Sequence, residues 1–205
     1  MRPTRTYSAI AAISWPILYG LFRLRARGRE NIPTDGGFVL ACNHMSSFDP
    51  WPLGLPLWPK RFLRFMAKSE LYWFPLTFVL NGAGAFPVRR GQADTEAIET
   101  AVQLARAGNI VAMFPEGTRR TKGLVKRFEA RPRTGAARIA LEAGVPLVPA
   151  AVRGTDHLRR FAPIGVVYGA PVDIDDLRGA ADLREAAQLA TDRLMARIEE
   201  LEASL

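Results

Sequence analysis

The sequence predicts a single α/β domain, in which helices flank a mostly buried, mixed β-sheet and an amphipathic or hydrophobic helix comes first. Short apolar segments, rich in β-branched and aromatic residues, alternate along the chain with longer segments of helical periodicity. With 205 residues, 48% of them hydrophobic and 23% charged, the chain is long enough for one core and too apolar for an extended disordered protein. It contains no internal repeat and no low-complexity tract.

The first predicted element is an apolar run at residues 7–22, which we assign to an N-terminal membrane-associating helix at 1–22, ahead of the main domain at 23–205. The run is shorter than the roughly 20 residues that a membrane span needs. Pro16 and Gly20 also weaken a straight helix. Arginines flank the run on both sides, which suits a lipid interface. A helix packed on the domain is the alternative.

Six strands are predicted after this run, each a short apolar segment bounded by turn residues. They lie at residues 38–41, 62–66, 85–88, 110–114, 145–152 and 164–168.

Three helices are predicted between and after these strands. Those at 95–107 and 134–143 are each followed by a glycine at a C-cap position, Gly108 or Gly144. The last segment repeats apolar residues at steps of three and four, which gives one apolar helical face: Leu183, Ala187, Ala190, Leu194, Ile198 and Leu201.

The formal charge of +8 predicts an anionic partner, whether nucleic acid, anionic lipid or a phosphorylated substrate. Basic residues concentrate at 119–133, where Phe128 is the one aromatic residue, so base stacking is poorly supported. Cys42 is the single cysteine, which excludes an intrachain disulfide. Together with only two histidines, it argues against a structural zinc site.

A polar segment at residues 43–50 directly follows the first predicted strand and contains His44 and Asp49. At this spacing the carboxylate can accept a hydrogen bond from Nδ1–H of His44 and leave Nε2 to take a proton. Such a pair is a hydrolase triad without its serine, whose part a substrate hydroxyl could play. The competing interpretations are an ordinary loop histidine and an aspartate that caps a helix starting at Pro50.

Three further segments accompany predicted strands. Residues 114–119 (Phe-Pro-Glu-Gly-Thr-Arg) combine a glycine, which permits close backbone approach, with Thr118 and Arg119 as donors for a phosphate. Residues 84–90 end in two arginines, and residues 145–149 read Val-Pro-Leu-Val-Pro. Taken singly, each has a structural interpretation, respectively a polar turn, solvated arginines and a buried strand.

Taken in order, N-H-x4-D, G-x5-R, F-P-E-G-T-R and V-P-L-V-P resemble the four sequence blocks of the glycerolipid acyltransferase family. The branch looks like the bacterial 1-acylglycerol-3-phosphate acyltransferases (PlsC type), and the similarity runs from about Arg25 to Tyr168. The resemblance implies transfer of a fatty acyl group from acyl-CoA or acyl carrier protein to the sn-2 hydroxyl of 1-acylglycerol 3-phosphate. The product would be phosphatidic acid, in phospholipid biosynthesis.

The resemblance also implies residue roles, with His44 as general base and Asp49 as its partner. Two positions depart from the family pattern. Arg120 stands where Ser is usual, and residues 133–135 (Arg-Thr-Gly) follow a lengthened basic loop in place of Phe-Lys-x-Gly. Both departures bear on the choice of acceptor. The acceptor and phosphate site would comprise Lys68, Arg90, Glu116, Gly117, Thr118 and Arg119.

We expect direct transfer without an acyl-enzyme, because the chain has no G-x-S-x-G segment and Cys42 sits within a predicted strand. No metal or bound cofactor is expected beyond the acyl thioester co-substrate. The apolar stretches 51–58 and 71–80 could line an acyl tunnel, or could pack the core. The expected location is the cytoplasmic side of the cell membrane, on a surface with anionic lipid.

Two kinds of alternative function remain open at this stage. The nearer one is an acyltransferase for another lysophospholipid or for glycerol 3-phosphate. The other is a basic module that binds a membrane surface or nucleic acid without chemistry. Loss of His44 or Asp49 would have indicated such a module, and both residues are present.

Overall fold

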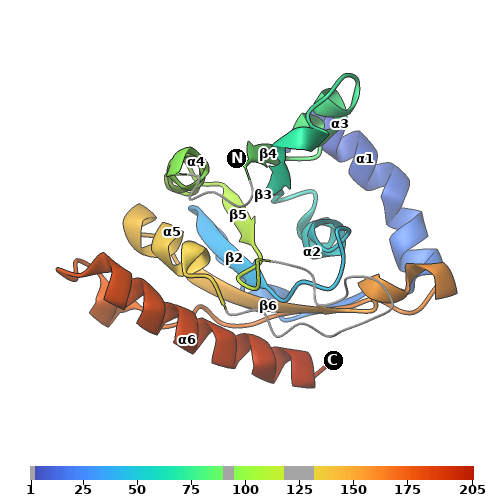
Figure 1. Cartoon of the computed structure of the whole chain (residues 1–205). Coiled ribbons are helices and arrows are strands. Elements are labelled where there is room, and N and C mark those ends of the chain that lie inside the picture. The colour runs from blue at the N-terminus through green and yellow to red at the C-terminus, as the bar shows by residue number, and fades with distance from the viewer. Residues whose placement is uncertain (1–2, 90–94, 118–131) are drawn as a thin grey trace.

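The computed structural model describes residues 3–89, 95–117 and 132–205. These residues form one seven-stranded sheet, in the order β1-β7-β6-β2-β5-β3-β4, with helices on both faces (Figure 1). This confirms the predicted single α/β domain. The strands are β1 (Arg25–Arg27), β2 (Phe38–Cys42), β3 (Leu63–Lys68), β4 (Ala85–Val88), β5 (Ile110–Met113), β6 (Leu147–Arg153) and β7 (Gly165–Tyr168). The α-helices are α1 (Arg5–Pro16), α2 (Pro50–Gly54), α3 (Leu76–Gly82), α4 (Thr95–Arg106), α5 (Gly135–Ala143) and α6 (Leu183–Ala203).

Short non-α helical turns complete the described elements. A π-helical segment, η1 (Ile17–Leu21), continues α1. The 3₁₀ turns are η2 (Arg29–Asn31), η3 (Leu55–Leu57), η4 (Ser69–Leu71), η5 (Thr155–Arg160) and η6 (Asp175–Leu177).

The sheet is mixed, as predicted. The neighbouring strands β6, β2, β5, β3 and β4 run parallel, β7 is antiparallel to β6, and β1 is parallel to β7. β5 and β6 flank β2 on opposite sides, so the chain changes direction across the sheet at β2. Ligands of α/β proteins bind outside the carboxyl ends of the strands at such a switch point.

Alternate residues of β2 contribute to two separate cores, because this strand is buried on both faces. Phe38 and Leu40 pack in the core that includes residues of α1 and α2. Val39 and Ala41 pack in the core that includes residues of α4, α5 and α6 (Figure 1). The central strand that carries the His44 segment is therefore held from both sides.

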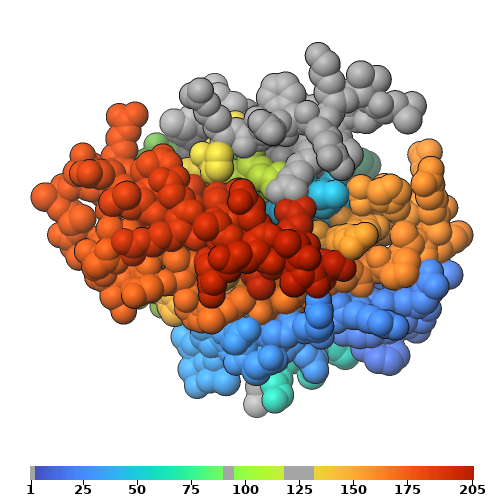
Figure 2. Space-filling model, turned by 90° about the horizontal axis from the view of Figure 1, so that it is seen from below, coloured from blue at the N-terminus to red at the C-terminus, as the bar shows by residue number. Residues whose placement is uncertain are grey.

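The helices that cover the second face follow the predicted pattern. Gly144 adopts the left-handed conformation at the end of α5, with φ of 69°, and Gly108 does so after α4, with φ of 85°. Asp182 caps α6 by accepting hydrogen bonds from two backbone amides. The predicted apolar face is confirmed for Ala187, Ala190, Leu194 and Ile198, which are buried, and is wrong for Leu183, which is exposed at the first turn of the helix. α6 covers much of the surface on this side (Figure 2).

The N-terminal apolar run forms α1 and η1, and it packs on the domain along one side. Tyr7, Ala11 and Leu18 belong to the core of the first face, and the Tyr7 ring lies 5.3 Å from that of Phe62. The opposite side exposes large apolar side chains: Ile13, Trp15, Ile17 and Leu21. In the described ranges, no helix is both long and apolar enough to cross a membrane.

Candidate active site

His44 and Asp49 form a buried pair in the loop that follows β2. Nδ1 of His44 lies 2.8 Å from Oδ2 of Asp49, and the two residues are 6% and 0% exposed. The same oxygen accepts hydrogen bonds from the backbone N–H groups of Met45, at 2.8 Å, and Ser46, at 2.9 Å. The loop therefore closes around the carboxylate, and the hydrogen bond expected from the sequence is present.

The alternative role of Asp49, as the cap of the next helix, is wrong. Asp49 precedes α2, and Pro50 is the first helical residue, as the sequence indicated. However, Asp49 has helical backbone angles, with φ of −51° and ψ of −39°, and its side chain makes no capping hydrogen bond. The carboxylate turns back towards the preceding loop, where two backbone amides and the imidazole compete successfully for it.

The tautomer of His44 follows from its partner. An ionised carboxylate only accepts hydrogen bonds, so Nδ1 carries the proton in the neutral imidazole and the lone pair remains on Nε2. The ring also stacks on Phe114, with a centroid distance of 4.3 Å and an interplanar angle of 26°. Asp49 on one side and Phe114 on the other thus fix the orientation of the ring.

β6 and the first residue of η5, which follows it, hold the two ends of this loop through hydrogen bonds. Before His44, buried Asn43 donates to the carbonyl of Val152 at 3.0 Å and accepts from its N–H at 2.8 Å. After the loop, Oδ1 of Asp49 accepts a hydrogen bond from the Thr155 hydroxyl at 2.6 Å. The sequence analysis identified neither Asn43 nor Thr155 in these roles, because their partners lie more than a hundred residues away.

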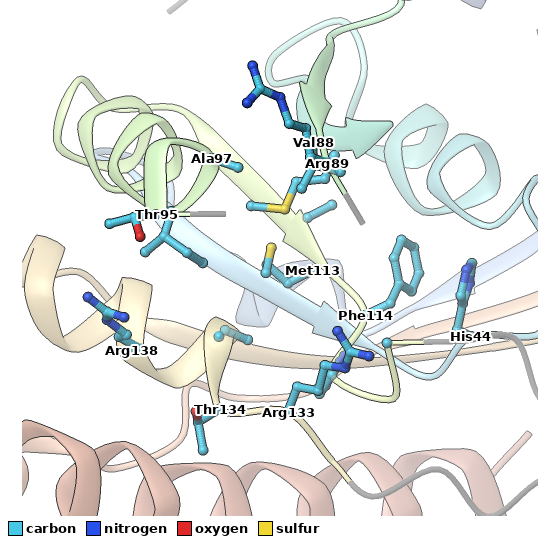
Figure 3. A pocket seen from close by; sticks show the side chains of 17 residues that line it. His44, Val88, Arg89, Thr95, Ala97, Met113, Phe114, Arg133, Thr134 and Arg138 are labelled. Carbon is cyan, nitrogen blue, oxygen red and sulfur yellow. The ribbon is translucent and has the colours of Figure 1, made fainter. Parts of the chain in front are cut away.

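A cavity of about 470 Å³ opens beside His44, at the carboxyl ends of the parallel strands (Figure 3). Thr95 at the start of α4 and Gly135 at the start of α5 also line it, so the amino ends of both helices border the cavity. Such ends favour negative charge. Its walls are mostly apolar and come from Met66, Val88, Ala97, Ile98, Ala112, Met113, Phe114, Pro115 and Ala136, while Arg89, Arg133 and Arg138 supply positive charge.

The second motif follows β5 and forms part of the cavity wall through Gly117. Gly117 has φ of 64°, and a Cβ atom there would lie 2.5 Å from Nε of Arg133, so a side chain would strain the backbone and displace this arginine. The backbone N–H of Arg133 donates to the carbonyl of Pro115 at 2.7 Å. Arg133 consequently lies across this motif, and Figure 3 shows its guanidinium on the side towards Phe114 and His44.

The other predicted binding residues are placed as follows. Glu116 is 5% exposed and does not line the cavity. Lys68 is the exposed last residue of β3, in register with Val88, and it does not line the cavity either. Arg90, Thr118 and Arg119 lie outside the described residues. The roles of all these residues therefore stay predictions.

Arg133 lines the cavity, although the sequence analysis did not single it out as a site residue. The sequence signal was present, since this arginine immediately precedes the Thr-Gly pair at the start of α5 and stands where the family pattern has a lysine nearby. It was treated as part of a basic loop. The contact with Gly117 shows that it belongs to the site.

The two stretches considered for an acyl tunnel do not line this cavity. In residues 51–58, Leu53, Leu55 and Leu57 are buried in the core, so core packing accounts for that stretch. In residues 71–80, by contrast, Trp73, Phe74, Phe78 and Val79 are exposed. The apolar walls beside His44 come instead from the ends of β3, β4 and β5 and from the starts of α4 and α5.

The site defines a class of enzyme. A histidine oriented by a carboxylate has Nε2 available as a base, and within the described residues no side-chain hydroxyl or thiol is hydrogen-bonded to that atom. This arrangement suits a group-transfer enzyme in which a substrate supplies the hydroxyl to be activated.

The chain belongs to the family described as Acyltransferase, whose model matches residues 23–153. It is similar to the 1-acyl-sn-glycerol-3-phosphate acyltransferase of Bacillus subtilis, with 33% identity over 189 residues and coverage of 89% of each chain. It is also 27% identical to a chloroplastic 1-acyl-sn-glycerol-3-phosphate acyltransferase of Brassica napus, over 73% of this chain and 43% of that protein.

A solved structure supports the same relationship. The crystal structure of PlsC from Thermotoga maritima, a 1-acyl-sn-glycerophosphate (LPA) acyltransferase, superimposes with a TM-score of 0.66 at 27% sequence identity. The match covers 95% of this chain and 79% of that one. The α/β fold of this chain is thus shared, over most of its length, with a member of this family.

Proposed function

We propose that the chain transfers a fatty acyl group from an acyl thioester to the sn-2 hydroxyl of 1-acylglycerol 3-phosphate, giving phosphatidic acid. The observation that carries this proposal is the His44–Asp49 hydrogen bond of 2.8 Å beside a cavity with apolar walls and arginines. The names of the Bacillus, Brassica and Thermotoga relatives support the choice of acceptor.

In the proposed reaction, Nε2 of His44 removes the proton from the sn-2 hydroxyl while the oxygen attacks the thioester carbonyl carbon. The C–O bond forms, the C–S bond breaks, and the thiolate of coenzyme A or acyl carrier protein leaves. The imidazolium then returns its proton to the thiolate, so that the enzyme is restored. Asp49 stabilises the imidazolium through the Nδ1 hydrogen bond.

The acceptor phosphate is assigned to the arginines around the motif after β5. A guanidinium presents paired donors that match phosphate oxygens, and a phosphate monoester carries more negative charge than a diester headgroup. Arg133 lies against Gly117 and lines the cavity together with His44. We therefore add Arg133 to the proposed phosphate site, for which the sequence already predicts Arg90 and Arg119.

The acyl chain is assigned to the apolar walls of the cavity. Met66, Ile98 and Met113 lie on these walls, and their side chains favour contact with methylene groups over water. The thioester carbonyl would then lie at the His44 end of the cavity.

Attachment to an anionic membrane surface, on the cytoplasmic side, completes the proposal. Trp15 at the end of α1 and Ile17 at the start of η1 are exposed apolar residues. Phe78 on α3 and Phe74, just before this helix, are exposed as well. α1 and α3 lie side by side (Figure 1). Exposed aromatic and aliphatic side chains on neighbouring helices suit insertion into the headgroup region.

The test is acyl transfer by the pure protein with labelled acyl-CoA or acyl carrier protein and a panel of acceptors. We expect labelled phosphatidic acid from 1-acylglycerol 3-phosphate, and less product from lysophosphatidylcholine or glycerol 3-phosphate. His44→Ala should lower kcat by at least about 10²-fold, the low end for loss of a general base. His157→Ala is the matched control, because His157 is exposed and pairs with Asp156 outside the cavity. Normal turnover by folded His44→Ala protein would refute the assignment.

A further inference from the structure

We infer that Thr155 is a positioning residue for the catalytic pair, and that its hydroxyl fixes the orientation of the Asp49 carboxylate. The inference deepens the proposed function, since it rests on His44 acting as the base.

The evidence begins with the environment of Asp49. This side chain is fully buried, and a buried carboxylate is costly unless both of its oxygens have hydrogen-bond donors. Oδ2 accepts hydrogen bonds from Nδ1–H of His44 and from the two backbone N–H groups of the loop. Oδ1 accepts a hydrogen bond from the hydroxyl of Thr155 at 2.6 Å, and Thr155 is itself 1% exposed. Within the described part of the chain, this hydroxyl is the one side-chain donor to Oδ1.

The fold directs Thr155 to this position through a tight turn at the end of β6. Gly154 has φ of 90° and ψ of −6°, and a Cβ atom there would collide with the carbonyl oxygen of Pro163. Only glycine fits such a turn. Two residues earlier, Val152 holds Asn43 by the paired hydrogen bonds described above. The end of β6 and the turn that follows it thus hold both ends of the loop that carries His44.

Hydrogen bonds on both oxygens set the plane of a carboxylate, and with it the line from Oδ2 to Nδ1. Without the Thr155 hydroxyl, the buried Oδ1 would have no side-chain donor among the described residues, and the carboxylate would reorient or bind a proton more tightly. Reorientation weakens the support of the imidazolium that forms during transfer, and this lowers kcat. The loss of a donor on Oδ1 acts separately: it raises the proton affinity of the pair, which moves the acid limb of the kcat/KM profile to higher pH.

Other titratable groups lie near the His44–Asp49 pair and bear on the pH profile. Cys42 and Glu116 are buried on the adjoining segments, and on η5 the exposed His157 pairs with the partly buried Asp156. Among the described residues that line the cavity, the titratable side chains other than His44 are the arginines Arg89, Arg133 and Arg138. A profile measured on His157→Ala separates the titration of that histidine from the acid limb.

The test compares Thr155→Val, which removes the hydroxyl at similar volume, with Thr155→Ser, which keeps it. We expect Thr155→Val to lower kcat by about 10- to 100-fold, the value of one hydrogen bond to a charged group. KM for both substrates should change little, the acid limb should move up, and Thr155→Ser should restore most of kcat. Thr191→Val is the matched control, since buried Thr191 bonds the Ala187 carbonyl within α6. It should retain kcat.

Three results would overturn the inference: turnover of Thr155→Val equal to that of Thr191→Val, an acid limb that does not move, or no recovery with Thr155→Ser. Failure of the proposed function is distinguishable, because the ¹H–¹⁵N signal of the His44 Nδ1 proton requires no substrate. A shift of this signal in Thr155→Val, alongside wild-type protein that transfers no acyl group, would uphold the contact and reject the reaction. An unchanged signal would reject the contact itself.

Discussion

Replacing Asp49 with asparagine removes the charge beside His44 while keeping the size of the side chain. The structure predicts how the amide would sit. The groups that meet Oδ2 are all N–H donors, from His44, Met45 and Ser46, so the asparagine oxygen must take that position. Its NH₂ group must then face Thr155, whose hydroxyl can accept as well as donate. The loop therefore keeps its conformation, and the variant tests charge rather than folding.

The expected magnitude follows from the geometry of the pair. An opposite charge in direct contact stabilises a protonated group by about 1.4 to 4 kcal/mol, so its loss should lower kcat by about 10- to 10³-fold. Hydrogen bonds from the loop amides change from charged to neutral acceptors, which should cost about 1 to 2 kcal/mol of unfolding free energy and lower Tm by about 2 to 8 °C.

The assay is kcat at saturating substrates, with thermal unfolding followed by circular dichroism on the same preparations. Asp176→Asn is the control, because Asp176 is exposed and bonds Arg193 on the surface rather than in the cavity. It should leave kcat unchanged. Folded Asp49→Asn protein with wild-type kcat would refute the reasoning, since the carboxylate would then have no part in supporting His44.

Two further predictions concern the acceptor and the membrane. Arg133→Lys keeps the charge but loses the paired donors, so KM for 1-acylglycerol 3-phosphate should rise about 10-fold while KM for the acyl donor stays constant. Equal changes in both KM values would mean that Arg133 has a structural role only. The combined change of Ile13, Trp15 and Ile17 to serine should abolish salt-resistant binding to anionic vesicles in a flotation assay, because these side chains are exposed and contribute nothing to the core. Binding that persists at high salt would contradict the membrane proposal.

Hydrophobic patterning was sufficient to predict most of the fold. The strand segments beginning at Phe38 and Ile110 are continuous apolar runs because their residues are buried on both faces of a parallel sheet. β1 could not be predicted in this way, since Arg25–Arg27 is an edge strand with two exposed arginines and no apolar pattern. The burial of Tyr7 and Leu18 also has no local signal, because it depends on which face of the sheet the helix meets.

The candidate site was predictable only where its contacts are local. His44 and Asp49 are five positions apart, so spacing alone indicated that they could meet. Asn43 and Thr155 are separated from their hydrogen-bond partners by 109 and 106 positions in the sequence. Neither segment contains a local pattern that indicates its partner. The place of Arg133 in the site could not be predicted, because it depends on Gly117, whose positive φ and missing side chain leave space for the guanidinium.

The position of β6 between β2 and β7 has a consequence for the order in which the site forms during synthesis. His44 and Asp49 are made early, yet the Asn43–Val152 and Asp49–Thr155 bonds require the end of β6. Contacts of such sequence separation form late, after the intervening chain has been ordered. A growing chain that has not reached Gly154 therefore has its histidine and its aspartate but not the segment that aligns them, and it completes the hydrogen bonds around this pair only when β6 docks and the turn after it forms.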